Sequence, residues 1–358
     1  MRSRLIPIHF RPQLPLPLIA FLIALLLPAP SQAQTSADSS ALDASAFAVY
    51  TSDGTTATLD DVLAAVDTVD VVFLGEQHDD PTAHALQDAL FRRTLSHEGD
   101  STATPRPVAL SLEMFARDAQ PVVDEYLGGW ITEQHFRNAA QAWSNYADYR
   151  PLVEAAKAAD RPVLAANAPR RYVNRVARAG AASLADLPAS AHSWLPPLPY
   201  PMPSAAYQAK WMDLMRDAMP PGHGASADSS DAAPGASAHG SMPHGARHGA
   251  GAHDTIPPML QAQGLWDATM GYTIAEHLMR EPDALVIHLT GAFHMTRGTG
   301  TPETLRHYRP SARVLTVVLQ PAADVAAFDT DAHAGLGDFV ILTDETRIPE
   351  RPSLPGME

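Results

Sequence analysis

Two short polar motifs, Gly75-x-x-His78 and Gly291-x-x-His294, each follow directly after an apolar run of the sequence. Glu76 lies inside the first motif, so a carboxylate and an imidazole stand two residues apart. Histidine and glutamate together can act as a general acid and base, or can bind a divalent metal ion that keeps an open coordination position. The motifs therefore indicate a site for catalysis or for metal binding.

The run before the first motif, residues 71–74 (VVFL), is short, continuous and rich in β-branched and aromatic side chains. Such a run predicts a strand buried on both faces, as in parallel sheets. Asp80 and Pro81 then resemble the N-cap and first position of a helix that extends to about residue 97. The first motif is thus expected on a turn from a parallel strand into a helix.

Three more apolar runs predict buried strands at 108–112, 162–166 and 284–290. They end at Glu113, Asn167 and the second motif with His294. The carboxyl ends of parallel strands share one edge of a sheet, where ligands bind in open α/β folds. We therefore expect Glu76, His78, Glu113 and His294 to converge as catalytic residues, with His78, Glu113 and His294 as metal ligands in the metal-dependent case.

The order of the elements predicts an α/β fold in which helices flank a parallel sheet. Further strands are expected at 314–319 and 339–342. Two long stretches without strands, about 115–160 and 181–260, are expected to form an inserted small helical subdomain over the site. Helices are predicted at 59–66, 80–97, 119–127, 132–143, 151–159, 169–180, 205–219 and 261–280, with another capped by Thr301 and Pro302.

The first 33 residues have the features of a secretory signal peptide, with three arginines, an apolar run at 14–27 and a small-residue cleavage site ending at Ala33. Cleavage there would begin the mature chain at Gln34, followed by a disordered leader at 34–48 and one domain at 49–358. The sequence has no cysteine, which excludes a lipid anchor on cysteine, disulfides and thiolate metal sites. The expected location is the periplasm or outside the cell, with no membrane span after cleavage.

The formal net charge is −15, and losing the three arginines of the first 33 residues moves it to −18. So acidic a chain argues against nucleic acid as a partner.

A low-complexity stretch at 220–253 is rich in histidine, glycine, alanine and serine. Imidazole suits zinc, nickel or copper, so weak metal capture is one interpretation and an inert linker is the other. The candidate ligands are His223, His239, His244, His248 and His253.

Five segments give the chain a resemblance to a known family: LGEQHDD (74–80), SLEMF (111–115), WSNYADYRPL (143–152), AANAPRR (165–171) and LTGAFHMTRGTGTP (289–302). Together they resemble the ChaN-like haem-binding uptake family, whose superfamily also holds Tiki, TraB and erythromycin esterase proteins. The resemblance spans residues 50–320. It implies a parallel α/β domain with a small helical domain, haem as cofactor and partner, a role in iron uptake, and a homodimer.

Haem iron can be ligated by tyrosine or histidine, which makes Tyr146, Tyr149 and Tyr172 candidates. Arg171, Arg175 and Arg178 fall on one face of the helix predicted at 169–180, where they could bind haem propionates. With Asn167, at the end of the third strand, Arg171 and Arg175 complete the expected cofactor-binding set. A solvent-exposed face is the alternative for the arginines, and helix packing is the alternative for the tyrosines.

Two functions therefore remain open. The first is an exported haem-binding protein of iron uptake. The second is a metal-dependent hydrolase, peptidase-like or esterase-like, in which Glu76 is the base and a divalent metal ion activates water.

Overall fold

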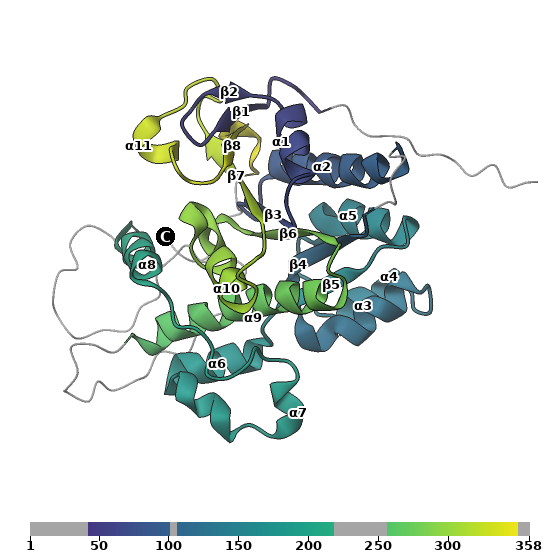
Figure 1. Cartoon of the computed structure of the whole chain (residues 1–358), viewed down its shortest axis with the longest axis vertical. Coiled ribbons are helices and arrows are strands. Elements are labelled where there is room, and N and C mark those ends of the chain that lie inside the picture. Colours follow the sequence, from purple (N-terminus) through teal and green to yellow (C-terminus); the bar gives the residue numbers. More distant parts are fainter. Residues whose placement is uncertain (1–41, 101–105, 218–255, 350–358) are drawn as a thin grey trace, which may run out of the picture. The chain divides into compact units, whose positions relative to one another are not determined.

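The computed structural model describes residues 42–100, 106–217 and 256–349. These residues form one sheet in the strand order β2-β1-β8-β7-β3-β6-β4-β5 (Figure 1). The strands are β1 (Phe47–Thr51), β2 (Thr56–Ala57), β3 (Val71–Glu76), β4 (Val108–Ala116), β5 (Val163–Asn167), β6 (Leu285–Gly291), β7 (Val314–Ala322) and β8 (Phe339–Asp344). Strands β3 to β8 pair in parallel, whereas β1 is antiparallel to both β2 and β8. The predicted α/β fold with a parallel sheet is confirmed.

The longer helices cover the two faces of this sheet. They are α1 (Leu59–Val66), α2 (Pro81–Asp100), α3 (Gln120–Leu127), α4 (Glu133–Ala139), α5 (Tyr146–Ala158), α6 (Arg170–Ala179), α8 (Ala205–Asp217), α9 (Pro258–Arg280) and α10 (Thr301–Tyr308). Short helices complete the described chain: η1 (Arg117–Ala119), η2 (Ala181–Asp186), α7 (Ala189–His192), η3 (Ala292–His294), η4 (Thr296–Gly298), α11 (Thr330–His333) and η5 (Glu345–Arg347).

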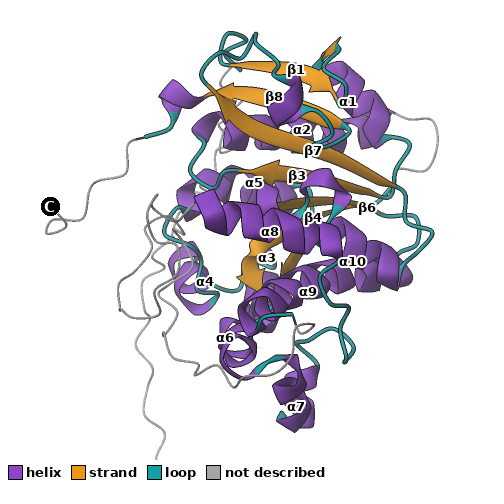
Figure 2. Cartoon of the chain, turned by 90° about the vertical axis from the view of Figure 1, so that its left-hand side faces the viewer, coloured by secondary structure: helices purple, strands orange, loops and turns teal. Residues whose placement is uncertain are grey.

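The direction in which the chain crosses the sheet decides which helix covers which face. From β3 the chain passes to β4 and then to β5 in one direction, whereas from β5 it returns to β6 and then to β7 in the other. Crossovers between parallel strands are right-handed, so the two directions place their helices on opposite faces. Accordingly α2 and α5 lie on one side of the sheet and α9 and α10 on the other (Figure 2).

The apolar core follows this division. One cluster joins β3 and β4 to the helices α1 to α5, with fully buried Leu86, Phe91 and Phe136. A second joins the opposite face to α9 and α10 through Ile274 and Leu305. A third packs α6 and η2 against α9. The two helical stretches expected to form one subdomain thus belong to different clusters, because they follow crossovers of opposite direction.

Several element boundaries differ from the sequence predictions. Phe47 and Ala48, assigned to the leader, begin β1. Helix α5 begins five residues earlier than predicted and contains Pro151. The N-cap of α10 is Gly300, so the predicted cap Thr301 is the first helical residue. The predicted signal peptide and histidine-rich stretch lie outside the described residues. Among the described helices, none is long and apolar enough to cross a membrane.

Candidate functional site

The first Gly-x-x-His motif forms a buried hydrogen-bond network around Glu76, which ends β3 and is 2% exposed. His78 Nδ1 donates to Glu76 Oε1 at 3.0 Å, and the Tyr149 hydroxyl donates to the same oxygen. Gln87 donates to Glu76 Oε2 at 2.6 Å. His84 and Asn145 donate to the carbonyl of His78 at 3.1 and 2.6 Å. The carboxylate therefore fixes the orientation of the His78 ring, which also contacts Trp143 edge to face with 4.7 Å between the ring centroids.

The second motif forms a parallel arrangement around His294. Asp267, in the middle of α9 and 1% exposed, accepts from His294 Nδ1 at 3.0 Å and from the Thr301 hydroxyl at 2.9 Å. His294 Nε2 then faces Glu113 Oε1 at 3.8 Å. The other oxygen of Glu113 accepts from the amide of Gly291 and the hydroxyl of Thr290, both at 2.8 Å. Each motif histidine is thus oriented by its own buried carboxylate.

The glycines of the two motifs let the two turns interlock. A Cβ added at Gly291 would lie 3.0 Å from Nε2 of His78, in the opposite motif. A Cβ added at Gly75 would lie 2.4 Å from the sulfur of Met295, which directly follows the second motif. Because β3 and β6 are neighbours in register, Gly75 opposite Thr290 and Glu76 opposite Gly291, each turn occupies the space that a side chain on the other would fill.

The buried carboxylates change the protonation of both histidines. Burial alone would lower the pKa of His78, but the hydrogen bond that His78 donates to Glu76 and the charge of Glu113 outweigh this effect and raise the pKa to about 9. For His294 burial again lowers the pKa, and the charges of Asp267 and Glu113 outweigh it, so the pKa is raised. His78 is therefore protonated on both ring nitrogens at neutral pH. In this state the first motif can act as an acid rather than as a base.

Helix α8 is anchored to the second motif by two side chains. Lys210 Nζ donates to the carbonyl of Phe293 and the hydroxyl of Thr299, both at 2.6 Å, and to the carbonyl of Thr296 at 3.2 Å. Burial lowers the pKa of Lys210 to about 8. Tyr207 is 1% exposed and packs edge to face on Phe293, with 5.2 Å between the ring centroids. These contacts fix the turn that carries His294 from the side opposite the sheet.

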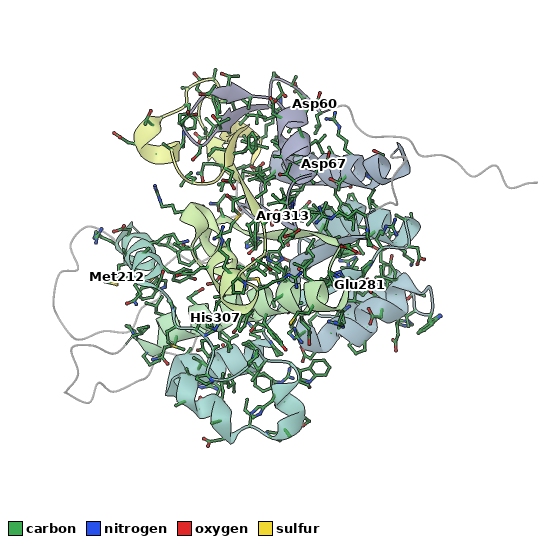
Figure 3. The ribbon with its side chains drawn as sticks, in the orientation of Figure 1. Asp60, Asp67, Met212, Glu281, His307 and Arg313 are labelled. Atoms are coloured by element: carbon green, nitrogen blue, oxygen red, sulfur yellow. The ribbon has the colours of Figure 1, made fainter. Side chains whose placement is uncertain are left out.

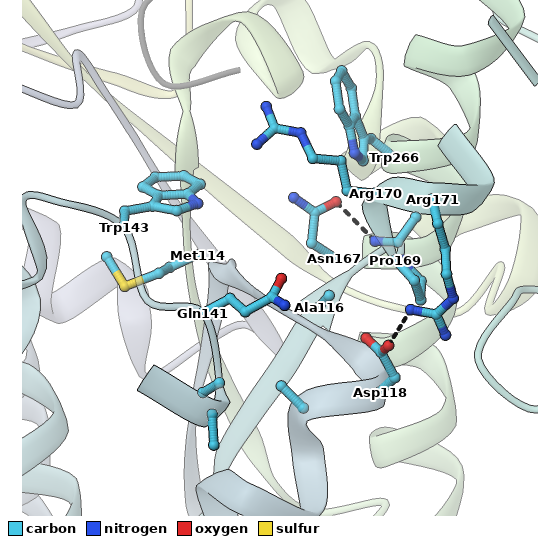
Figure 4. A pocket seen from close by; sticks show the side chains of 14 residues that line it. Met114, Ala116, Asp118, Gln141, Trp143, Asn167, Pro169, Arg170, Arg171 and Trp266 are labelled. Atoms are coloured by element: carbon cyan, nitrogen blue, oxygen red, sulfur yellow. Dashed lines mark hydrogen bonds and ion pairs between the residues drawn. The ribbon is translucent and has the colours of Figure 1, made fainter. Parts of the chain in front are cut away.

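A cavity of about 330 Å³ opens beside the two motifs, at the carboxyl ends of β4 and β5. Figure 4 shows Trp143 on one side of it and Trp266, with Arg170 and Arg171, on the other. Trp143 contacts His78, and Trp266 lies edge to face with His294, with 6.2 Å between the ring centroids. Each indole therefore connects the cavity wall to one motif. Asn167 also lines it. The cavity has two aromatic walls and a basic rim.

The structure brings together the four predicted catalytic residues, Glu76, His78, Glu113 and His294, at one edge of the sheet. It does not arrange them as a metal centre. Within residues 42–100, 106–217 and 256–349, no group of three or more histidine, cysteine, aspartate or glutamate side chains could hold a metal ion. The predicted metal site of His78, Glu113 and His294 therefore has no support from the described geometry. The five other histidines proposed as metal ligands, His223, His239, His244, His248 and His253, lie outside the described residues.

The predicted cofactor-binding residues are distributed more widely. Asn167 and Arg171 line the cavity, but Arg175 donates to the carbonyl of Ser183 at 2.9 Å and pairs with Asp186, away from it. Arg170 takes the place expected of Arg175, because the first turn of α6 faces the cavity and Arg175 is more than a turn further along.

None of the three candidate tyrosines lines this cavity. Tyr149 lies behind Trp143 in the Glu76 network, and Tyr146 is buried in the aromatic packing around Phe136. Tyr172 stacks under Arg171, whose guanidinium carbon is 4.4 Å from the ring centre. Of the lining residues, Met114 alone has a side chain of a type that ligates haem iron.

Sequence reasoning missed Asp267, Gln87, Lys210 and Trp266. Asp267 had one available signal, because it is a lone carboxylate in the apolar stretch 264–275 of a long helix. A buried charge in such a stretch needs a partner, and here the partner is His294. Lys210 and Gln87 had no comparable signal, since both lie on helices that also carry exposed polar residues.

Comparisons with known proteins bear on the family and the fold of the chain. A family model described as haem-binding uptake, Tiki superfamily, ChaN, matches residues 62–305, the segment from α1 to α10. A solved structure that describes cofacial haem binding to ChaN of Campylobacter jejuni superposes with a TM-score of 0.56 at 15% identity. It covers 84% of this chain and 97% of that one, which shows a shared fold.

Two more distant structures also align. An erythromycin esterase mutant in an open conformation gives a TM-score of 0.40 at 9% identity, covering 83% of each chain. A Bacillus cereus protein gives a TM-score of 0.41 at 10% identity, and the alignment covers 86% of this chain and 96% of that one. A comparison with curated proteins finds no match.

Proposed function

The chain belongs to the haem-binding uptake family of the Tiki superfamily, the ChaN family, and we propose that it binds haem in the cavity between Trp143 and Trp266. The observation that carries the proposal is the cavity itself, which combines two indole walls with a basic rim. Its volume of about 330 Å³ is in the range of small-molecule sites.

The chemistry of the wall fits a planar ligand with an anionic edge. Indole rings offer large apolar faces on which a porphyrin can stack. Arg170 and Arg171 supply guanidinium groups that bind carboxylates such as haem propionates. Arg171 already pairs with Asp118, so a propionate would compete with that carboxylate. Bound haem would supply an iron centre, and the residues named here would hold and orient the porphyrin.

Titration of haem into the protein, followed in the Soret band, tests the proposal. We expect saturation near one haem per cavity in the wild type and binding weaker by at least about tenfold in Trp143→Ala and Trp266→Ala. Trp130→Ala is the matched control, because Trp130 is 80% exposed and does not line the cavity. No saturable Soret change, or equal losses in all three variants, would contradict haem binding at this site.

The same spectra assign the axial ligand. If the Met114 thioether binds the iron, Met114→Leu changes the Soret position and Tyr149→Phe and Tyr172→Phe do not. If a phenolate binds the iron, the variant in which that tyrosine is replaced by phenylalanine changes the spectrum instead.

The homodimer, export and a role in iron uptake stay predictions. Sedimentation with and without haem tests the homodimer. The intact mass of the protein from its native host tests export, through the cleavage predicted after Ala33.

A further inference from the structure

Gln141 lies on the wall of the haem-site candidate, the cavity between Trp143 and Trp266, and its backbone is left-handed, with a φ of +53°. A residue with a Cβ adopts this conformation at a cost in free energy. Besides glycine, the residues enriched there are asparagine, aspartate and histidine, and glutamine is not among them. Strained backbone positions of this kind cluster at binding sites, so the glutamine requires a reason.

The turn at Gln141 needs the left-handed backbone but not the glutamine side chain. Gln141 directly follows the C-cap of α4, and the next amide, that of Ala142, donates to the carbonyl of Arg137 at 3.0 Å. This hydrogen bond is typical of a helix end at which the left-handed residue is glycine. Asp160 has the same place after α5, with a φ of +55° and the same bond from the following amide at 2.8 Å. Asp160 is of a residue type that tolerates this conformation, and it does not line the cavity.

The Gln141 side chain adds an amide group to the cavity wall (Figure 4). This amide makes no hydrogen bond to a described residue. Asn167 lines the same cavity and is 8% exposed. Its Oδ1 accepts from the amide of Ala168 at 2.8 Å, whereas its Nδ2 makes no hydrogen bond within the described part of the chain. A side-chain amide that is nine-tenths buried needs a partner for its N–H groups, so the wall calls for a ligand that accepts hydrogen bonds.

The periphery of haem carries apolar methyl and vinyl groups, and its only hydrogen-bond acceptors there are the propionates. Arg171 is one donor for a propionate, but it already pairs with Asp118. An amide donates to a carboxylate without attracting that competing acid. Resting on the proposed function, we propose that Gln141 is a specificity-determining residue whose amide donates to a propionate of the bound porphyrin, with Asn167 Nδ2 as a second donor. This contact explains why glutamine occupies a position that suits glycine.

Haem and haem dimethyl ester, each titrated into the full chain and followed in the Soret band, test this contact. Gln141→Gly removes the amide and should weaken haem binding about tenfold, because a hydrogen bond to a charged group is lost. The ester has no carboxylate charge, so the same variant should weaken its binding less than about threefold. Without haem, Gln141→Gly should raise the melting temperature by about 2 °C, because the backbone strain is relieved. Asp160→Gly is the matched control, since it changes the same kind of helix end outside the cavity and should leave haem binding unchanged.

Gln141→Glu tests the charge of the ligand group. This variant keeps the shape of the side chain and places a carboxylate beside the propionate, so haem binding should be weaker than in Gln141→Gly, while ester binding should change little. Two controls measure long-range charge effects. Gln134→Glu adds the same charge at an exposed position of α4, and Glu281→Gln removes one at the exposed end of α9, labelled in Figure 3. Neither residue lines the cavity, so both variants should bind haem as the wild type does.

Three results would overturn the role of Gln141 and leave haem binding in the cavity intact. They are an equal loss of haem and ester binding in Gln141→Gly, unchanged haem binding in both Gln141 variants, and a lower melting temperature in Gln141→Gly, which would give the glutamine a purely structural reason. Failure of the proposed function looks different. A wild type that takes up no haem, or Trp143→Ala and Trp266→Ala variants that bind haem as Trp130→Ala does, would overturn both proposals.

Discussion

Glycine is required at position 291 by a side chain from a distant part of the chain, not by its own backbone. Its φ of −56° is available to any residue, yet an added Cβ would lie 3.0 Å from the imidazole of His78. The second motif therefore begins with glycine because the histidine of the first motif lies over it.

Gly291→Ala should destabilise the protein by about 1–3 kcal/mol, because the new methyl group forces His78 out of its rotamer. Urea unfolding measures this cost. In the His78→Ala background the methyl group has room, so the same substitution should cost less than about 1 kcal/mol. Equal costs in both backgrounds would show that the contact with His78 does not explain the glycine.

The protonation of His78 predicts a pH dependence of stability. Its pKa in the folded protein, about 9, is above the unfolded value of about 6.5. The proton therefore stabilises the folded state fully below pH 6.5, and this stabilisation, up to about 3 kcal/mol, is lost as the pH rises to 9. The lowered pKa of Lys210 acts in the opposite direction above pH 8, so the decline should be clearest from pH 6.5 to 8.

Urea unfolding at several pH values should show this decline in the wild type and a flatter profile in His78→Gln. His307→Asn is the control, since His307 is exposed and outside both motifs. A profile that keeps its slope in His78→Gln would contradict the assignment.

How far the site could be predicted depended on where each residue stands in its element. Glu76, His78, Glu113 and His294 follow or end apolar runs, so their convergence follows from the geometry of parallel sheets. Asp267 and Lys210 are on helices, where a polar residue resembles a solvent-exposed position. Their burial depends on the packing of α8 and α9 against the second motif, which no local pattern contains.

At the scale of elements, the free edge of β5 is covered by a side chain. Strand β5 pairs with β4 alone, and Gln120 at the start of α3 lies along its other edge. The Gln120 amide donates to the carbonyl of Val163 at 2.9 Å and accepts from the amide of Ala165 at 2.7 Å. One side chain thus makes the two hydrogen bonds that a neighbouring strand would make.

Gln120→Met should remove both bonds while keeping the side-chain volume. We expect a loss of about 1–3 kcal/mol in the free energy of unfolding, because two partly buried backbone groups become unpaired. Hydrogen exchange should accelerate at Ala165 more than at Val317 in the centre of the sheet. Unchanged exchange at Ala165 would show that the edge does not depend on Gln120.

The sequence predicts which segments are helices and which are strands better than it predicts where each of them begins and ends. The parallel strands and long helices follow from apolar runs and periodicity. Helix α5 starts before Pro151 because a proline within the first turns interrupts few helical hydrogen bonds. Gly300 replaces Thr301 as the cap of α10 because its φ of +71° suits glycine, while the Thr301 hydroxyl is used by Asp267.

At the scale of the whole molecule, the described core closes without the histidine-rich stretch. The cluster that packs α6 against α9 takes its buried residues from 166–200 and 262–270, on either side of that stretch. The stretch itself has little apolar content to bury. Its removal should therefore affect neither the core nor the haem-site candidate.

Deleting residues 224–251 leaves six residues on each side, 218–223 and 252–257, to join α8 to α9. We expect the melting temperature and the haem titration to stay nearly unchanged. If the histidines capture metal, copper or zinc binding should weaken in the deletion variant but persist in His78→Ala, and in the wild type it should fade as the pH falls through about 6.5, where imidazole becomes protonated. A deletion variant that unfolds, or that loses haem together with metal, would mean that this stretch packs on the site and belongs to the folded core.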